Sequence, residues 1–137
     1  MKIYCLEDFK VEFEKLQSKK SYQGLETQVI SYFFGKTSEQ LANGTRLNHS
    51  SEVPYIKKRL DGSGGFRAYY LLLLKDEKLV LMFVHPKTGS LGASNIDDNY
   101  KAYLYKKVLA CIESDELYEL VLNDEQSNIQ FERKSKD

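Results

Sequence analysis

The chain has 137 residues, and its 20 Lys and Arg balance 20 Asp and Glu, so its length and charge predict one neutral domain of ordinary size. Hydrophobic residues make up 42% and charged residues 29%, which is typical of a folded globular protein and excludes a wholly disordered chain. The longest apolar run, residues 68–74, is too short to span a membrane. With no secretory signal and no CxxC spacing, the two cysteines are expected to be free thiols in a reducing cytoplasm, and no membrane partner is expected.

Charge is unevenly distributed along this neutral chain. Residues 56–111 carry ten Lys and Arg against five Asp and Glu, whereas residues 112–137 carry three against eight. A basic middle with an acidic tail predicts an anionic ligand and a tail that folds over the basic segment and blocks it. Ordinary scatter of charge over a surface is the alternative, and both interpretations stay open at this point.

The hydrophobic periodicity predicts an α+β fold with an antiparallel β-sheet. The order is an N-terminal strand, two helices, three strands, a C-terminal helix and a short β tail. The expected elements are a strand at 2–6, a helix from Asp8, a helix from Ser21 to Gly35, a capped turn at 37–44, a loop at 43–53, strands at 55–60, 66–74 and 79–85, a helix capped by Asp97 or Asp98, and a hairpin made of 117–122 and 129–131. The strand at 66–74 is apolar on nearly both faces, which predicts an interior place in the sheet.

Apolar residues at helical spacing define the buried side of each predicted helix. They are Phe9, Phe13 and Leu16 in the first helix, Leu25, Val29 and Phe33 in the second, and Leu104, Val108 and Ile112 in the last. Lys101, Lys106 and Lys107 are expected on the outer side of the last helix. In the strand at 55–60, alternation places Lys57 and Arg59 on one face and Lys58 on the other.

Most familiar catalytic motifs are absent. The glycine-rich run at 62–65 lacks the Gly-Lys-Ser/Thr ending of a phosphate-binding P-loop. The Lys-Thr-Gly at 87–89 has no Ser-x-x-Lys to supply a nucleophile. His49 and His85 stand apart, without the paired His and Cys spacing of a zinc site, so no metal or cofactor is expected.

Basic residues do gather at the open end of a predicted hairpin. Arg67 begins its first strand, while His85 and Lys87 end the second. Because the start of one antiparallel strand lies beside the end of the next, Arg67 should lie near His85 and Lys87, with 57–59 on the preceding strand close by. Arginine and lysine bind phosphate and histidine titrates near neutrality, so this cluster predicts a site for a phosphate-bearing ligand.

Each residue of this cluster also has a structural explanation. Arg67 could pair with Asp61, and His85 could be a hydrogen-bonded strand end. Five tyrosines could offer faces on which bases stack: Tyr69, Tyr70, Tyr100, Tyr103 and Tyr105. The three in the last helix cannot share one helical face, so at least one of them should serve packing.

Short motifs in the middle of the chain point to a family. They are IKKRLDG at 56–62, GFRAYY at 65–70 and FVHPKT at 83–88. In these motifs the chain resembles the RelE/ParE superfamily of bacterial toxins, which includes the RelE-like and HigB-like mRNA interferases. The resemblance covers residues 1–112 and implies a RelE-like domain there, with 113–137 as an acidic extension.

The resemblance implies a metal-independent endoribonuclease that cleaves mRNA on the ribosome by attack of a 2′-hydroxyl on the adjacent phosphate. Arg67 would hold or polarise that phosphate, Lys87 would stabilise charge on the phosphorane or leaving oxygen, and His85 could be the acid or base. The substrate-binding residues it implies are Lys57, Lys58, Arg59, Tyr100 and Tyr103. The implied partners are RNA or the ribosome and a cognate antitoxin protein.

Two other functions stay open. A catalytically weak or inactive protein of the RelE fold would act as a module that binds a protein or a nucleic acid. A ParE-like gyrase inhibitor would need no RNase residues. Strongly salt-dependent RNA binding without cleavage would favour the nucleic-acid-binding module.

Overall fold

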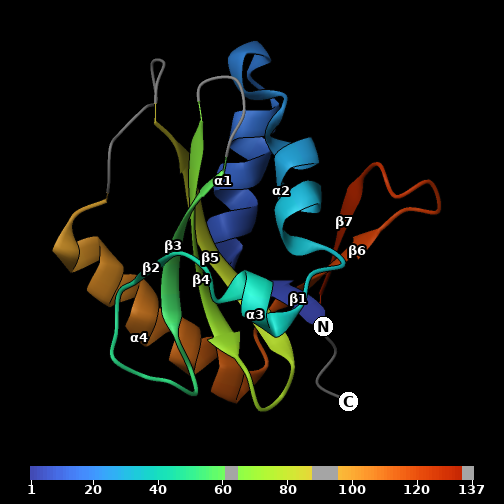
Figure 1. Cartoon of the computed structure of the whole chain (residues 1–137). Helices are drawn as coiled ribbons and strands as arrows, with labels where there is room; N and C mark the ends of the chain where they lie inside the picture. Colours follow the sequence, from blue (N-terminus) through green and yellow to red (C-terminus); the bar gives the residue numbers. More distant parts are fainter. Residues whose placement is uncertain (61–64, 88–95, 134–137) are drawn as a thin grey trace.

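A computed structural model describes residues 1–60, 65–87 and 96–133. Over these residues the protein is a mixed α+β fold around a seven-stranded, mostly antiparallel sheet (Figure 1). Its elements in chain order are β1 (Lys2–Cys5), α1 (Glu7–Gln17), the 3₁₀ turn η1 (Lys20–Tyr22), α2 (Leu25–Phe33), α3 (Ser38–Leu41), β2 (Thr45–Arg46), β3 (Tyr55–Leu60), β4 (Phe66–Leu73), β5 (Lys78–Pro86), α4 (Asp98–Ser114), β6 (Tyr118–Leu122) and β7 (Ile129–Arg133). None of the helices in these ranges is long and apolar enough to cross a membrane.

The strands follow the spatial order β2-β3-β4-β5-β1-β6-β7. The interior position predicted for 66–74 is confirmed, because β4 lies between β3 and β5. The prediction of an antiparallel sheet is correct for most neighbours and wrong for one, since β1 runs parallel to β5. That pairing joins segments more than seventy residues apart, as in Lys2 opposite Lys78, and local periodicity carries no signal for it.

Helices cover both faces of the sheet. Figure 1 shows α4 on one face and α1 and α2 on the other. Each predicted apolar side is buried, with the exception of Ile112, which is only partly buried. Side chains of the sheet therefore divide into two cores, and the face that carries Tyr55, Tyr69 and Val80 packs against α4.

Two predicted helix caps are present. Thr37 and Gln40 form a reciprocal capping box at α3, with the Gln40 amide donating to Thr37 Oγ1 over 3.2 Å. Asp97 caps α4 by accepting from the Tyr100 amide at 2.7 Å. This cap fixes where α4 begins, and it thereby positions the first turn of the helix over the sheet.

The predicted boundaries differ from the structure in two places. The first residues of the helix expected from Ser21 form the turn η1 instead. Helix α2 begins only after Gly24, a residue with low helix propensity. The loop expected at 43–53 contains the two-residue strand β2, which pairs with β3. The turn at 61–64 and the segment 88–95 lie outside the described residues.

The acidic tail lies at the opposite edge of the sheet from β2 and β3. Strand β6 pairs with β1, and β7 pairs with β6. The prediction that this tail covers the basic hairpin is therefore wrong for residues 118–133. Leu120 and Ile129 are buried in the core beneath α1 and α2, so burial of apolar side chains decides where the hairpin docks.

Candidate functional site

Three basic side chains form a row across the α4 face of the sheet. The register places Arg59 opposite Arg67, and Arg67 opposite His85. Neighbouring strands are about 4.8 Å apart, so the row spans about 10 Å. The hairpin geometry expected from the sequence is thus present, and it brings together three of the predicted site residues.

The positive charge of this row is not neutralised by the part of the chain that the structure describes. Arg67 is only 7% exposed, and its Nη1 donates to the Phe66 carbonyl at 3.2 Å. Like charges directly opposite each other, as in Arg59 and Arg67, repel. Among residues 1–60, 65–87 and 96–133, neither arginine takes part in an ion pair. The pairing of Arg67 with Asp61 considered from the sequence lies outside the described residues.

Lys57 adds a further cation in the next row of the same face. It lies two residues before Arg59 and opposite Tyr69. Burial lowers the pKa of the Lys57 ammonium, and the nearby charges of Lys101 and Arg67 lower it further. The repulsion indicates that these three cations lie close together, which favours the binding of an anion between them.

Lys58 lies on the other face of β3. Its Nζ donates to the Gln40 carbonyl at 3.1 Å and lies 5.9 Å from the centre of the ring of Tyr70, a residue of the core under α1 and α2. Burial, followed by repulsion from Lys36, lowers the pKa of Lys58. The structure therefore separates Lys58 from the row that contains Arg67.

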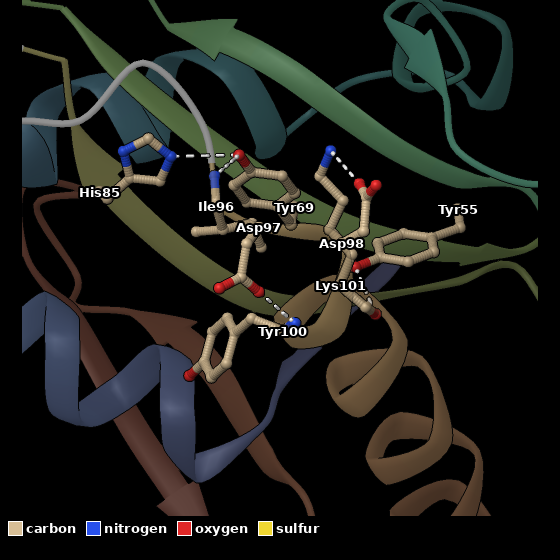
Figure 2. Close-up of polar contacts among 8 residues, drawn as sticks. All are labelled: Tyr55, Tyr69, His85, Ile96, Asp97, Asp98, Tyr100 and Lys101. Carbon is tan, nitrogen blue, oxygen red and sulfur yellow. Dashed lines mark hydrogen bonds and ion pairs between the residues drawn. The ribbon is translucent and has the colours of Figure 1, made fainter.

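A hydrogen-bonded chain holds His85 in one orientation (Figure 2). Its Nε2 lies 3.1 Å from the Tyr69 hydroxyl, and that hydroxyl accepts from the Ile96 amide at 3.4 Å. Its Nδ1 lies 3.0 Å from the Pro86 carbonyl, an acceptor only. These partners assign the neutral tautomer in which Nδ1 donates and Nε2 accepts from Tyr69.

The surroundings of His85 favour this neutral form. Its pKa is lowered from 6.5, first by burial and then by the charges of Lys57 and Arg67, while the bond to the Pro86 carbonyl partly opposes the shift. Both ring nitrogens are engaged, which matches the alternative that His85 is a hydrogen-bonded strand end. To transfer a proton, the ring would first have to exchange one of these partners.

Aromatic rings connect His85 with the N-terminal half of α4. The sequence-predicted residues Tyr100 and Tyr103 lie at the far end of this series. The ring-centre distances are 5.6 Å for Tyr69–His85, 6.4 Å for Phe83–His85, 5.1 Å for Phe83–Tyr100 and 5.4 Å for Tyr100–Tyr103. Tyr100 is partly buried, and burial raises the pKa of its hydroxyl to about 12, so the hydroxyl stays protonated at neutral pH.

Not every predicted contact residue is available for a ligand. Tyr103 is 46% exposed, yet its hydroxyl donates to Asp8, to which Lys107 is also bonded. Lys107 is thus not a free lysine of the outer face. Tyr69 and Tyr70 are fully buried, and Tyr55 covers one face of the Tyr105 ring. The prediction that at least one helix tyrosine serves packing is confirmed.

Lys87 is exposed at the end of β5. Its amide donates to the Gly65 carbonyl at 3.1 Å, which extends the pairing of the hairpin by one residue beyond Pro86. This backbone contact places Lys87 beside the start of β4, near Arg67. No side-chain contact of Lys87 is recorded among the described residues.

Two functional neighbours were not identified from the sequence. The hydroxyl of Tyr69 serves His85, although Tyr69 was considered only as a stacking surface. Lys101 was expected on the outer side of its helix, but its side chain is 18% exposed and lies near Lys57. The alternation of side chains along β4 places Tyr69 on the same face as Arg67, so the sequence indicated that Tyr69 lies near the site. No local pattern indicated that Lys101 lies near Lys57.

The remaining observations concern metals and relatives. In the ranges that the structure describes, no group of three or more His, Cys, Asp or Glu could hold a metal ion. No protein-family model matches the sequence, and no curated protein is significantly similar to it. Interpretation of the site therefore depends on the arrangement of its own residues.

Proposed function

We propose that this protein is a RelE-like endoribonuclease that binds the RNA backbone on the α4 face of its sheet. The observation that carries the proposal is the row of Arg59, Arg67 and His85, with Lys57 beside it. The cations of this group, Lys57, Arg59 and Arg67, suit the phosphates of a polynucleotide. The reaction class comes from the resemblance of its motifs to those of RelE-like interferases.

The reaction requires stabilisation of charge more than a strong base. The 2′-oxygen attacks the adjacent phosphorus, and the bond from phosphorus to the 5′-oxygen breaks. The 2′-hydroxyl loses a proton and the leaving 5′-oxygen gains one, which yields a 2′,3′-cyclic phosphate and a 5′-hydroxyl. Arg67 would hold the phosphate oxygens, and Lys57 and Lys87 would stabilise the charge that develops on them.

In this proposal His85 is a positioning residue in the resting state. Its imidazole packs against Tyr69 and lies in the same row as Arg67. The engagement of both its nitrogens also favours a second candidate function, an RNA-binding module without cleavage. The two candidates share the phosphate site and differ in whether the bound RNA is cut.

Induced expression in a bacterial host tests the proposal. Growth and mRNA ends, mapped by primer extension, are compared for the wild type, Arg67→Gln and Arg133→Gln. The last variant makes the same substitution at the opposite edge of the sheet. We expect growth arrest and new internal mRNA ends for the wild type and Arg133→Gln, with both lost in Arg67→Gln.

Two outcomes would contradict cleavage by this site. Unchanged mRNA ends in folded Arg67→Gln would remove Arg67 from the reaction. Intact mRNA with a folded wild type, together with salt-dependent RNA binding that Arg67→Gln weakens, would leave the binding module as the function.

A further inference from the structure

A cavity opens on the same face of the molecule as the basic row. Its volume is about 520 Å³, within the range of pockets that hold small organic ligands. It lies between α4 and the segment that leads from β2 to β3, and Figure 2 shows Tyr55, Asp98 and Lys101 at this place. The lining residues are Arg46, Leu47, Asn48, Tyr55, Asp98, Lys101, Ala102 and Tyr105.

The interior of the cavity is largely apolar, and stacking and hydrogen bonds hold several of its side chains. The rings of Tyr55 and Tyr105 are nearly parallel, at 12°, with centres 5.6 Å apart. The Tyr55 hydroxyl donates to the Lys101 carbonyl at 3.2 Å, which ties the strand to the helix. The Asn48 side chain donates to the Val53 carbonyl and accepts from the Tyr55 amide. Because the rings of Tyr55 and Tyr105 are stacked on each other, a planar ring would stack against the outside of the pair and not between its rings.

The cavity adjoins the cations of the proposed phosphate site. Tyr55 and Lys57 lie on the same face of β3, two residues and therefore about 7 Å apart. Lys101 lines the cavity and lies close enough to Lys57 for their charges to repel. Its partner Asp98, at 3.6 Å, is fully exposed and holds it only weakly. A largely apolar cavity thus lies beside a group of cations.

We propose that this cavity binds the base of one RNA nucleotide, whose phosphate lies against Lys57 and Lys101. This inference rests on the proposed RNA-binding function and adds a base subsite to it. The outside of the stacked tyrosine pair would accept any base, so the subsite contributes affinity and position more than sequence selectivity. The nucleotide held here would fix the register of the strand with respect to Arg67.

The test fills the cavity without changing its charges. Ala102 lines it from α4, and Ala102→Met introduces a long side chain that is compatible with a helix. Ala110→Met is the matched control, because Ala110 is exposed on the same helix and does not line the cavity. Each protein is titrated with the four nucleoside 5′-monophosphates and with inorganic phosphate, followed by NMR.

We expect the wild type and Ala110→Met to bind the monophosphates more tightly than inorganic phosphate. Signals of Ala102 and Tyr105 should shift with the nucleotides only. Ala102→Met should bind nucleotides about tenfold more weakly, the loss expected for one stacked base, and should bind phosphate unchanged.

The inference is overturned if nucleotides bind no better than phosphate, or if Ala102→Met and Ala110→Met bind them equally well. If no nucleotide binds, the cavity would instead be a site for an apolar side chain of a protein partner. Failure of the proposed function is a separate result, since it is read from mRNA ends in Arg67→Gln. The protein could also bind nucleotides without cutting RNA. If Ala102→Met weakens that binding, the base subsite is supported as part of an RNA-binding module.

Discussion

Burial and the charges of Lys57 and Arg67 favour the neutral form of His85, and this has a consequence for stability. Its folded pKa lies below 6.5, so the unfolded chain takes up a proton more readily than the folded protein. The stability that depends on neutral His85 is fully present above about pH 6.5 and falls as the pH drops through the lower folded pKa.

We predict that an NMR titration gives His85 a midpoint below 6.5, with Nδ1 as the protonated nitrogen of the neutral ring. Urea unfolding between about pH 5 and 8 should show that His85→Gln has lost part of the decline in stability seen in the wild type on the acid side. A midpoint above 6.5, or an identical decline in the variant, would contradict this assignment.

The residues of the site differ in how far the sequence could predict them. The pairing of Arg67 with the end of the next strand followed from a short hairpin loop, and alternation placed Lys57 and Lys58 on opposite faces. The contact between Tyr69 and the Ile96 amide could not be predicted, because it depends on how the segment before α4 packs on the sheet. The proximity of Lys101 to Lys57 could not be predicted either, because it depends on how α4 packs on the sheet.

The attachment of β2 to β3 depends on a glycine. Gly44 precedes β2 with φ of +153°, and a Cβ built there would lie 2.6 Å from Ile56 Cγ2 and 2.9 Å from the Lys57 carbonyl oxygen. Because one of these atoms belongs to the backbone of β3, a side chain could fit only if the strands moved apart. The close approach therefore also holds the backbone of Lys57 in place.

We predict that Gly44→Ala lowers the free energy of unfolding by about 1–3 kcal/mol, the usual cost of overpacking. Gly24→Ala is the control, because Gly24 has φ of −76° and no atom within 4 Å of an added Cβ. That variant should be stabilised by about 0.4–1 kcal/mol. Equal effects of the two changes in chemical denaturation would be inconsistent with the close approach at Gly44.

Residue types and their spacing predicted most of the helices and strands. The capping box at α3, the Asp97 cap and the buried helix sides all followed from residue type and spacing. The start of α2 was misplaced because Gly24 interrupts a helical pattern that continues on both sides. Strand β2 has only two residues, both exposed, so it had no hydrophobic pattern to reveal it.

The whole molecule is neutral, yet the sheet separates its charges. The basic row lies on β3, β4 and β5, while the acidic hairpin occupies the opposite edge, where Glu119 faces Glu132 across β6 and β7. Net charge alone therefore misrepresents how the surface would attract RNA. The sequence showed the charge segregation, but the edge at which the tail docks depended on burial of Leu120 and Ile129.

If RNA phosphates bind on the α4 face, changes at Lys57 and Lys58 should differ in effect, because these adjacent residues lie on opposite faces of β3. The most direct measurement is the affinity of Lys57→Met and Lys58→Met for a single-stranded RNA that is 2′-O-methylated to prevent cleavage, determined over a series of salt concentrations. We predict that Lys57→Met weakens binding and reduces the slope of log affinity against log salt by about 0.7, the loss of one phosphate contact, whereas Lys58→Met changes neither. Equal losses of RNA affinity in both variants, or a loss in Lys58→Met alone, would contradict phosphate binding on the α4 face.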